Sequence, residues 1–190
     1  MPDRHPSLWQ HGHHVLYACC KGGIRLKDTL CVYPGSFDPI TLGHMDIISR
    51  AAGIFPKVVV AVLRNPNKPG CFPLEQRVQM IQKACCDITN VFVDCFEGLL
   101  VDYMKEKHSS VVIRGLRAVS DFEAEFQMAQ VNRQMYAPME TLFMMTSPEH
   151  AYISSSVVRE IAAFGGDIES FVPKAILTDI YQKFPRLQAD

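Results

Sequence analysis

The chain has 190 residues, of which 48% are hydrophobic and 21% charged, so it is long and apolar enough to bury the core of one globular domain. Nineteen basic residues face twenty acidic ones, and the formal net charge of -1 gives no overall attraction to nucleic acid or to an anionic membrane. The longest apolar runs, such as residues 58–63, are far shorter than the ~20 residues of a membrane span. We therefore expect a globular protein with neither a nucleic-acid nor a membrane partner.

Residues 1–28 differ in composition from the rest of the chain. They hold four of the seven histidines and the only tryptophan, and they show no hydrophobic period. The apolar run at residues 15–20 is too short for the ~7–15-residue core of a signal peptide. We expect residues 1–28 to form a poorly ordered or peripheral tail, and residues 29–190 to form a single domain.

The first half of this domain alternates strands and helices. Residues 29–33 are expected to form a buried strand, followed by a loop and by a helix at about residues 43–55. Residues 57–63 (KVVVAVL) are β-branched and continuous, which is typical of a strand covered on both faces. A proline-rich loop follows, and apolar side chains then recur at helical spacing at positions 74, 78, 81 and 85.

The same alternation continues to the end of the chain. Strands are expected at residues 91–93, 110–113 and 141–145, with helices near 99–104, 122–136 and 155–164 and a last one at 173–184. Five strands, each followed by a helix, predict an α/β protein with a doubly wound, five-stranded, parallel, Rossmann-like sheet. In such sheets, ligands bind beyond the carboxyl ends of the strands.

The first of these loops, residues 33–44 (YPGSFDPITLGH), has features of an anion site. Gly35 allows close backbone approach, and Ser36 offers a hydroxyl and an amide. His44 opens a helix whose free N–H groups favour an anion. Because the helix dipole opposes an imidazolium there, His44 is suited to be a neutral donor, or a cation paired with phosphate. An ordinary turn is the alternative.

Cations and hydroxyls also follow the other strands. Residues 64–68 (RNPNK) carry two cations, although a solvated surface loop is the better explanation of this segment taken alone. Arg114 and Arg117 flank Gly115 in a loop suited to bidentate phosphate binding, and Ser120 with Glu123 fits a capping box for the next helix. Residues 153–159 (ISSSVVR) start a helix with three serines and end with Arg159, which suggests a second anion site. We predict that these segments converge on one cleft for a polyanion.

Three of these segments resemble known signatures. Residues 33–44, 113–123 and 153–159 are similar, in matching order, to the T/H-x-G-H nucleotidylyltransferase superfamily, and together they closely resemble the bacterial phosphopantetheine adenylyltransferase family. The resemblance covers residues 29–184. It implies that the phosphate of 4′-phosphopantetheine attacks the α-phosphorus of ATP directly, with Mg²⁺, giving dephospho-coenzyme A and pyrophosphate. It also implies a homohexamer, and coenzyme A as a feedback inhibitor.

The resemblance implies roles for individual residues. His44 would hydrogen-bond the α-phosphate, with Lys68 and Arg117 as the other catalytic residues. The acceptor would be bound by Ser36, Lys68 and Arg114, and by Leu99 and Leu100 along the pantetheine arm, although core packing explains these two leucines equally well. ATP would contact Ser36, Phe37, His44, Gly115, Leu116, Arg117, Glu125, His150, Ala151, Tyr152, Ile153, Ser154, Ser155 and Ser156. No protein ligand to a metal is expected.

The sequence departs from the family pattern in a few places, and other functions stay open. Ser36 replaces a usual threonine, and Ala124, His150 and Tyr152 differ from the expected aromatic pattern near the nucleotide. A related enzyme could use nicotinate mononucleotide, or glycerol phosphate with CTP, but residues 149–155 lack the Arg-Thr-x-Gly-Ile-Ser-Thr segment usual in cytidylyltransferases. The third alternative is a non-catalytic nucleotide-binding module on the same fold.

The seven cysteines follow neither a disulfide framework nor a zinc site. Their number is odd and no C-x-x-C occurs: they are Cys19, Cys20, Cys31, Cys71, Cys85, Cys86 and Cys95. Outside the tail only His44, His108 and His150 remain, and none stands in ligand spacing with a cysteine. This composition indicates reduced thiols and a cytoplasmic protein.

Overall fold

The computed structural model describes residues 29–66 and 70–185, which alternate strands and helices as the sequence predicts. The strands are β1 (Leu30–Gly35), β2 (Lys57–Arg64), β3 (Val91–Glu97), β4 (Val111–Leu116) and β5 (Glu140–Met145). The helices are α1 (Leu42–Ile54), α2 (Leu74–Ala84), α3 (Leu100–Glu106), α4 (Val119–Met135), α5 (Ser155–Ala163) and α6 (Leu177–Lys183), with short 3₁₀ turns at Pro148–His150 and Lys174–Ile176. The expected tail at residues 1–28 lies outside the described residues.

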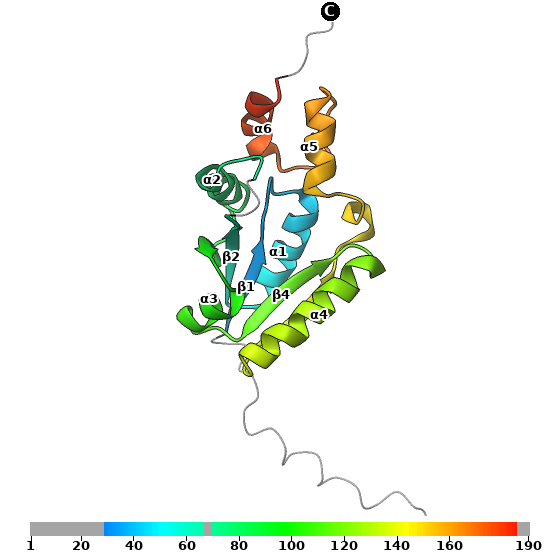
Figure 1. Cartoon of the computed structure of the whole chain (residues 1–190). Coiled ribbons are helices and arrows are strands. Elements are labelled where there is room, and N and C mark those ends of the chain that lie inside the picture. Colours follow the sequence, from blue (N-terminus) through cyan, green and yellow to red (C-terminus); the bar gives the residue numbers. More distant parts are fainter. Residues whose placement is uncertain (1–28, 67–69, 186–190) are drawn as a thin grey trace, which may run out of the picture.

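The five strands form one parallel sheet in the order β3-β2-β1-β4-β5. The chain moves outward from β1 to β3 and then crosses to β4, so the strand order reverses between β1 and β4. Right-handed crossovers in opposite directions place helices on both faces of the sheet. This arrangement is the doubly wound α/β fold that the sequence predicts (Figure 1).

Two hydrophobic cores cover the two faces of the sheet. The larger one packs α1, α2 and α6 against the strands, and includes Ile48, Met80 and Ile180. The smaller one packs α3 against the opposite face through Val101 and Met104. Because the central strands are covered on both sides, the continuous apolar sequence of β2 is buried from Val58 to Val62.

Three local expectations are wrong. β4 continues through Leu116, so Arg114 and Gly115 belong to the end of a strand and not to a loop; pairing with β5 up to Met145 holds them there. β3 likewise extends to Glu97 because it pairs with β2. Ser120 and Glu123 form no capping box. The N-cap of α4 is Ala118, which makes no side-chain hydrogen bond to the helix, so Ser120 and Glu123 lie within its first turns.

The cysteines of the described part are free thiols. Burial raises the pKa of Cys31 to about 12 and that of Cys85 to about 11, so neither is a reactive thiolate at neutral pH. No helix within residues 29–66 and 70–185 combines the length and the apolar character that crossing a bilayer requires.

Candidate active site

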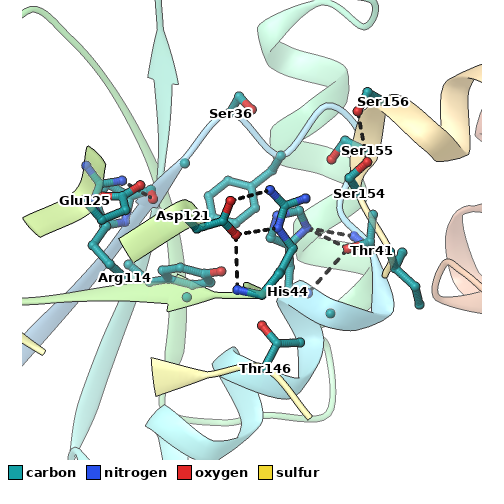
Figure 2. Close-up of a pocket in the computed structure, with 18 of the residues that line it drawn as sticks. Ser36, Thr41, His44, Arg114, Asp121, Glu125, Thr146, Ser154, Ser155 and Ser156 are labelled. Atoms are coloured by element: carbon teal, nitrogen blue, oxygen red, sulfur yellow. Dashed lines mark hydrogen bonds and ion pairs between the residues drawn. The ribbon is translucent and has the colours of Figure 1, made fainter. Parts of the chain in front are cut away.

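A cavity of about 530 Å³ lies where the strand order reverses, at the carboxyl ends of β1 and β4 (Figure 2). β1, the following loop and the start of α1 contribute Tyr33, Pro34, Gly35, Ser36, Phe37, Thr41, Gly43 and His44. β4, the following turn and α4 contribute Arg114, Gly115, Arg117, Ser120, Asp121, Ala124 and Glu125. Thr146 and the start of α5 complete the lining with Ile153, Ser154, Ser155, Ser156 and Arg159.

The orientation of His44 is set by the first turn of its own helix. Thr41 is the N-cap of α1, and its hydroxyl accepts a hydrogen bond from the His44 amide at 3.4 Å. In return the His44 Nδ1 accepts the Thr41 backbone N–H at 3.0 Å, which completes a capping box with histidine in the usual place of glutamate. A peptide N–H can only donate, so Nδ1 carries no proton in the neutral ring. The remaining proton is therefore on Nε2.

The imidazole of His44 is neutral in the free protein. Burial, and secondarily the positive charge of Arg117, lower the pKa of His44 from 6.5 to about 4. The sequence left two states open for His44, a neutral donor or a cation paired with phosphate. The lowered pKa favours the neutral donor. His44, Arg117 and the start of α5 line the same cavity, so the predicted convergence is confirmed for the segments after β1, β4 and β5. Arg64, of the segment after β2, is outside the lining and pairs with Glu97.

Both arginines of the predicted phosphate loop are held by carboxylates of α4. The Arg114 Nε lies 3.1 Å from a carboxylate oxygen of Glu125, and its Nη1 donates to the Pro34 carbonyl at 3.4 Å. The Nε and Nη2 of Arg117 donate hydrogen bonds to the Asp121 carboxylate at 3.1 and 3.3 Å. Burial acts to raise the pKa of Asp121, but hydrogen bonds from Arg117 lower it below its ordinary value. The carboxylates therefore fix two planar guanidiniums at the cavity.

The start of α5 brings three hydroxyls to the cavity, as predicted. Ser154 is the N-cap, and its hydroxyl accepts the Val157 amide at 3.2 Å. The hydroxyls of Ser154 and Ser156 lie 2.9 Å apart, and that of Ser155 donates to the Pro39 carbonyl at 2.7 Å. One serine thus caps the helix and another ties it to the loop after β1.

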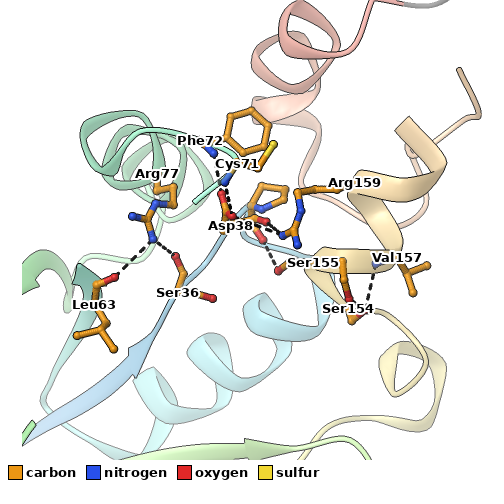
Figure 3. Close-up of polar contacts among 12 residues, drawn as sticks. Ser36, Asp38, Leu63, Cys71, Phe72, Arg77, Ser154, Ser155, Val157 and Arg159 are labelled. Atoms are coloured by element: carbon orange, nitrogen blue, oxygen red, sulfur yellow. Dashed lines mark hydrogen bonds and ion pairs between the residues drawn. The ribbon is translucent and has the colours of Figure 1, made fainter. Parts of the chain in front are cut away.

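Asp38 connects three segments at the back of the cavity (Figure 3). Its carboxylate accepts the backbone N–H groups of Cys71 and Phe72 at 2.8 and 2.9 Å. Arg159 donates to the Asp38 carbonyl and lies 3.5 Å from its carboxylate. Arg159 also lines the cavity, with its guanidinium held by Asp38, so its part in the predicted second anion site stays a prediction.

The structure places eleven of the predicted site residues in the cavity lining. They are Ser36, Phe37, His44, Arg114, Gly115, Arg117, Glu125, Ile153, Ser154, Ser155 and Ser156. Lys68 lies outside the described residues. The other residues predicted for ATP lie outside the lining. Leu116 is buried in the sheet, whereas Tyr152 is 66% exposed and its ring faces that of Phe171. His150 ends the short 3₁₀ turn that precedes Tyr152, and Ala151 follows it. Their assigned roles stay predictions.

The two leucines at the start of α3, Leu99 and Leu100, also lie outside this lining. Leu99 is 55% exposed, so the alternative that it is a core residue is wrong. Leu100 packs against the smaller hydrophobic core, as that alternative expects.

Several residues of the site were missed by the sequence interpretation. Thr41 sets the tautomer of His44, and Asp121 holds Arg117. Thr146 is buried at the end of β5, next to Ser147, whose amide and hydroxyl bind the Asp46 carboxylate at 3.0 and 2.9 Å. Only Thr41 carried a signal, since a threonine three residues before His44 fits an N-cap.

Within the described ranges, no three His, Cys, Asp or Glu side chains are grouped as a metal site would require. The carboxylates of the lining, Asp121 and Glu125, are each paired with an arginine. The arrangement therefore offers fixed hydrogen-bond donors and positive charge to a polyanion.

Comparison with known proteins assigns the class and then the family. The model of the cytidylyltransferase-like family matches residues 32–161, which defines the class of this fold and site. The chain is 53% identical over 156 residues to the phosphopantetheine adenylyltransferase of Heliobacterium modesticaldum, covering 82% of this chain and 93% of that protein. It is 50% identical over 156 residues to the enzyme of the same name from a Synechocystis strain, covering 82% and 98%. The chain belongs to the phosphopantetheine adenylyltransferase family, as its resemblance implied.

Solved structures agree on the fold. The nicotinic acid mononucleotide adenylyltransferase of Plasmodium falciparum, complexed with NaAD, matches with a TM-score of 0.59 and 19% identity, covering 82% of this chain and 95% of that one. A nicotinate-nucleotide adenylyltransferase structure from Vibrio parahaemolyticus matches with a TM-score of 0.57 and 13% identity, covering 81% and 91%. At these identities the likeness establishes the fold alone.

Proposed function

We propose that the protein transfers the adenylyl group of ATP to 4′-phosphopantetheine, giving dephospho-coenzyme A and pyrophosphate in coenzyme A biosynthesis. The observation that carries this function is the near full-length similarity, at about half identity, to enzymes named for it. The cavity supports it, because a neutral imidazole, two guanidiniums and a serine-rich helix start surround one hollow suited to phosphates.

The reaction needs positioning more than proton transfer. A phosphate oxygen of 4′-phosphopantetheine forms the new bond to the α-phosphorus of ATP, and the bond from that phosphorus to the β-phosphate bridging oxygen breaks as pyrophosphate leaves. The nucleophile is already an anion, so no strong general base is required. Bringing two anions together and stabilising charge on the α-phosphoryl oxygens are the difficult tasks.

The residues of the cavity match those tasks. The Nε2–H of His44 donates to an α-phosphoryl oxygen, and because the free imidazole is neutral at pH 7 it offers this proton without protonation from solvent. Arg117 and the Ser154–Ser156 segment bind the β- and γ-phosphates. Arg114 and Ser36, with Lys68, bind the phosphate of 4′-phosphopantetheine.

We propose that Mg²⁺ enters as the counterion of ATP, bound mainly by phosphate oxygens and water, as is usual for this metal in nucleotide sites. We assign neither lining carboxylate to it, because Asp121 and Glu125 each hold an arginine. In the cell we place the enzyme in the cytoplasm, on the basis of its free thiols. Coenzyme A, which contains the product's pantetheine arm, is its proposed feedback inhibitor.

A homohexamer is the proposed assembly, and an exposed apolar face supports subunit contact. α4 and the edge strand β5 leave large side chains exposed, including Phe122, Phe126, Met128, Val131, Met135, Leu142 and Met145. The rings of Phe122 and Phe126 lie 5.5 Å apart, and Phe122 meets Phe143 of β5 at 5.4 Å. Core packing within the subunit does not account for these side chains, because they are accessible in the single chain.

A pyrophosphate-release assay tests the proposed function. With ATP, Mg²⁺ and 4′-phosphopantetheine, the protein releases pyrophosphate, and mass spectrometry finds dephospho-coenzyme A in equal amount. Nicotinate mononucleotide with ATP, and glycerol 3-phosphate with CTP, serve as acceptor controls and give no comparable release. Binding of ATP without pyrophosphate release in the presence of 4′-phosphopantetheine would instead support a non-catalytic module.

A further inference from the structure

A buried arginine lies behind the cavity without lining it. Arg77 of α2 is 7% exposed, and its Nη1 donates to the Ser36 carbonyl at 2.8 Å and to the Leu63 carbonyl at 3.5 Å (Figure 3). Its Nε is buried and has no hydrogen-bond partner. One side chain therefore joins the loop after β1 to the end of β2.

This position is unfavourable for a cation on structural grounds alone. Arg77 lies near the N-terminal end of α2, where the helix dipole repels positive charge. Burying a guanidinium removes its hydration, and no carboxylate in the described part of the chain forms an ion pair with it. An apolar side chain of similar size would fill the space without these penalties, so packing does not explain the residue.

The peptide group held by Arg77 precedes a strained residue. Phe37, next to Ser36, has a φ of 43°, in the left-handed region that favours glycine. Ser36 itself is exposed to the cavity, with its hydroxyl and amide available to a ligand. Fixing the carbonyl of Ser36 from behind keeps this peptide in the orientation that presents Ser36 to the cavity.

The charges around this loop leave an excess of positive charge. A Cβ at Gly70 would meet the Asp38 carboxylate at 3.4 Å and the Arg77 Cζ at 3.5 Å, so both charged groups lie close to that glycine. The Asp38 carboxylate is already used by Arg159 and by two backbone amides. Within the described part of the chain, Arg77 thus keeps a positive charge that no carboxylate pairs with, in surroundings that screen charge weakly.

We propose that Arg77 is a positioning residue for the acceptor phosphate. It orients the Ser36 peptide toward the cavity, and its excess positive charge favours an anion on the other side of that peptide. This inference rests on the proposed function, in which Ser36 and Arg114 bind the phosphate of 4′-phosphopantetheine. The β- and γ-phosphates of ATP bind at Arg117 and α5, so the effect of Arg77 falls mainly on the acceptor.

The test compares Arg77→Met and Arg77→Lys with the wild type, and uses Lys83→Met as a matched control. Lys83 is at the other end of the same helix and pairs with Asp179 at 2.8 Å, away from the cavity. Steady-state kinetics vary each substrate in turn, calorimetry measures the dissociation constant of 4′-phosphopantetheine, and thermal unfolding reports stability.

Arg77→Met is expected to raise the KM and the dissociation constant for 4′-phosphopantetheine about tenfold, and to change the KM for ATP less than about twofold. Arg77→Lys keeps the charge and one donor, so it recovers part of the acceptor affinity. Lys83→Met leaves both KM values unchanged. If Arg77→Met does not fold, Arg77→Lys carries the comparison.

Two results overturn the inference. One is a folded Arg77 variant with wild-type affinity for 4′-phosphopantetheine; the other is an equal rise in both KM values, which indicates general damage to the site. A wild type that binds 4′-phosphopantetheine but releases no pyrophosphate contradicts the proposed function. The dissociation constants of the wild type and the Arg77 variants for 4′-phosphopantetheine still test the inference in that case. The two failures are therefore distinguishable.

Discussion

Replacing His44 with glutamine separates the titration of this residue from its role at the start of α1. Glutamine at this helical position is a usual partner of a threonine N-cap, so His44→Gln keeps an acceptor for the Thr41 N–H. The substitution removes the titrating group from the capping box. We therefore expect a folded variant whose stability differs from the wild type in its pH dependence.

The lowered pKa of His44 gives the size and sign of that difference. The pKa is 6.5 for an ordinary histidine and about 4 in the folded protein. Between these values the unfolded chain binds a proton that the folded protein does not, so the wild type loses stability as the pH falls. Relative to His44→Gln, the wild type loses about 2 kcal/mol of unfolding free energy by pH 5 and about 3 kcal/mol by pH 4. Above pH 7.5 the difference is constant.

Urea unfolding followed by circular dichroism measures this difference at pH 7.5, 6, 5 and 4.5. Protein concentration and ionic strength are kept fixed, because subunit assembly also contributes to apparent stability. All other titrating groups are common to both proteins and largely cancel in the comparison. A difference in unfolding free energy that stays constant across this range refutes a neutral imidazole whose pKa is lowered in the folded protein. A difference of opposite sign indicates that His44 is a stabilised cation.

Three further substitutions test the site and its support. His44→Ala is expected to lower kcat by at least ~10² while ATP affinity, measured by calorimetry, is largely kept; near-normal turnover contradicts the assigned role. Gly115→Ala would place a Cβ 3.2 Å from both Ile47 and the Tyr33 hydroxyl, so it lowers stability in urea by about 1–3 kcal/mol, and an unchanged midpoint argues against tight packing there. Asp38→Asn weakens the acceptor for two backbone amides and a guanidinium, and lowers the free energy of unfolding by about 1–3 kcal/mol; an equally stable variant shows that the charge is dispensable.

Most of the fold and part of the site were predictable because they depend on local patterns. The strand at β2 was predictable from an unbroken β-branched run, and the start of α5 from a serine N-cap. Parallel strands joined by helices bring their carboxyl ends to one edge, so the meeting of His44 and Arg117 followed from topology. The ends of β3 and β4 were not predictable, because neighbouring strands extend them beyond their apolar residues.

By itself, the sequence determined the alternation of strands and helices and placed residue types that bind phosphate after the strands. It also determined the family that these segments resemble. The tertiary structure decided which nitrogen of His44 bears the proton, which carboxylate holds each arginine, and that Asp38 and Arg77 join loops from behind the cavity. The physical reason is distance along the chain. The Arg77 bond to Ser36 spans 41 positions and the Arg159 bond to Asp38 spans 121, and only folding makes such groups neighbours.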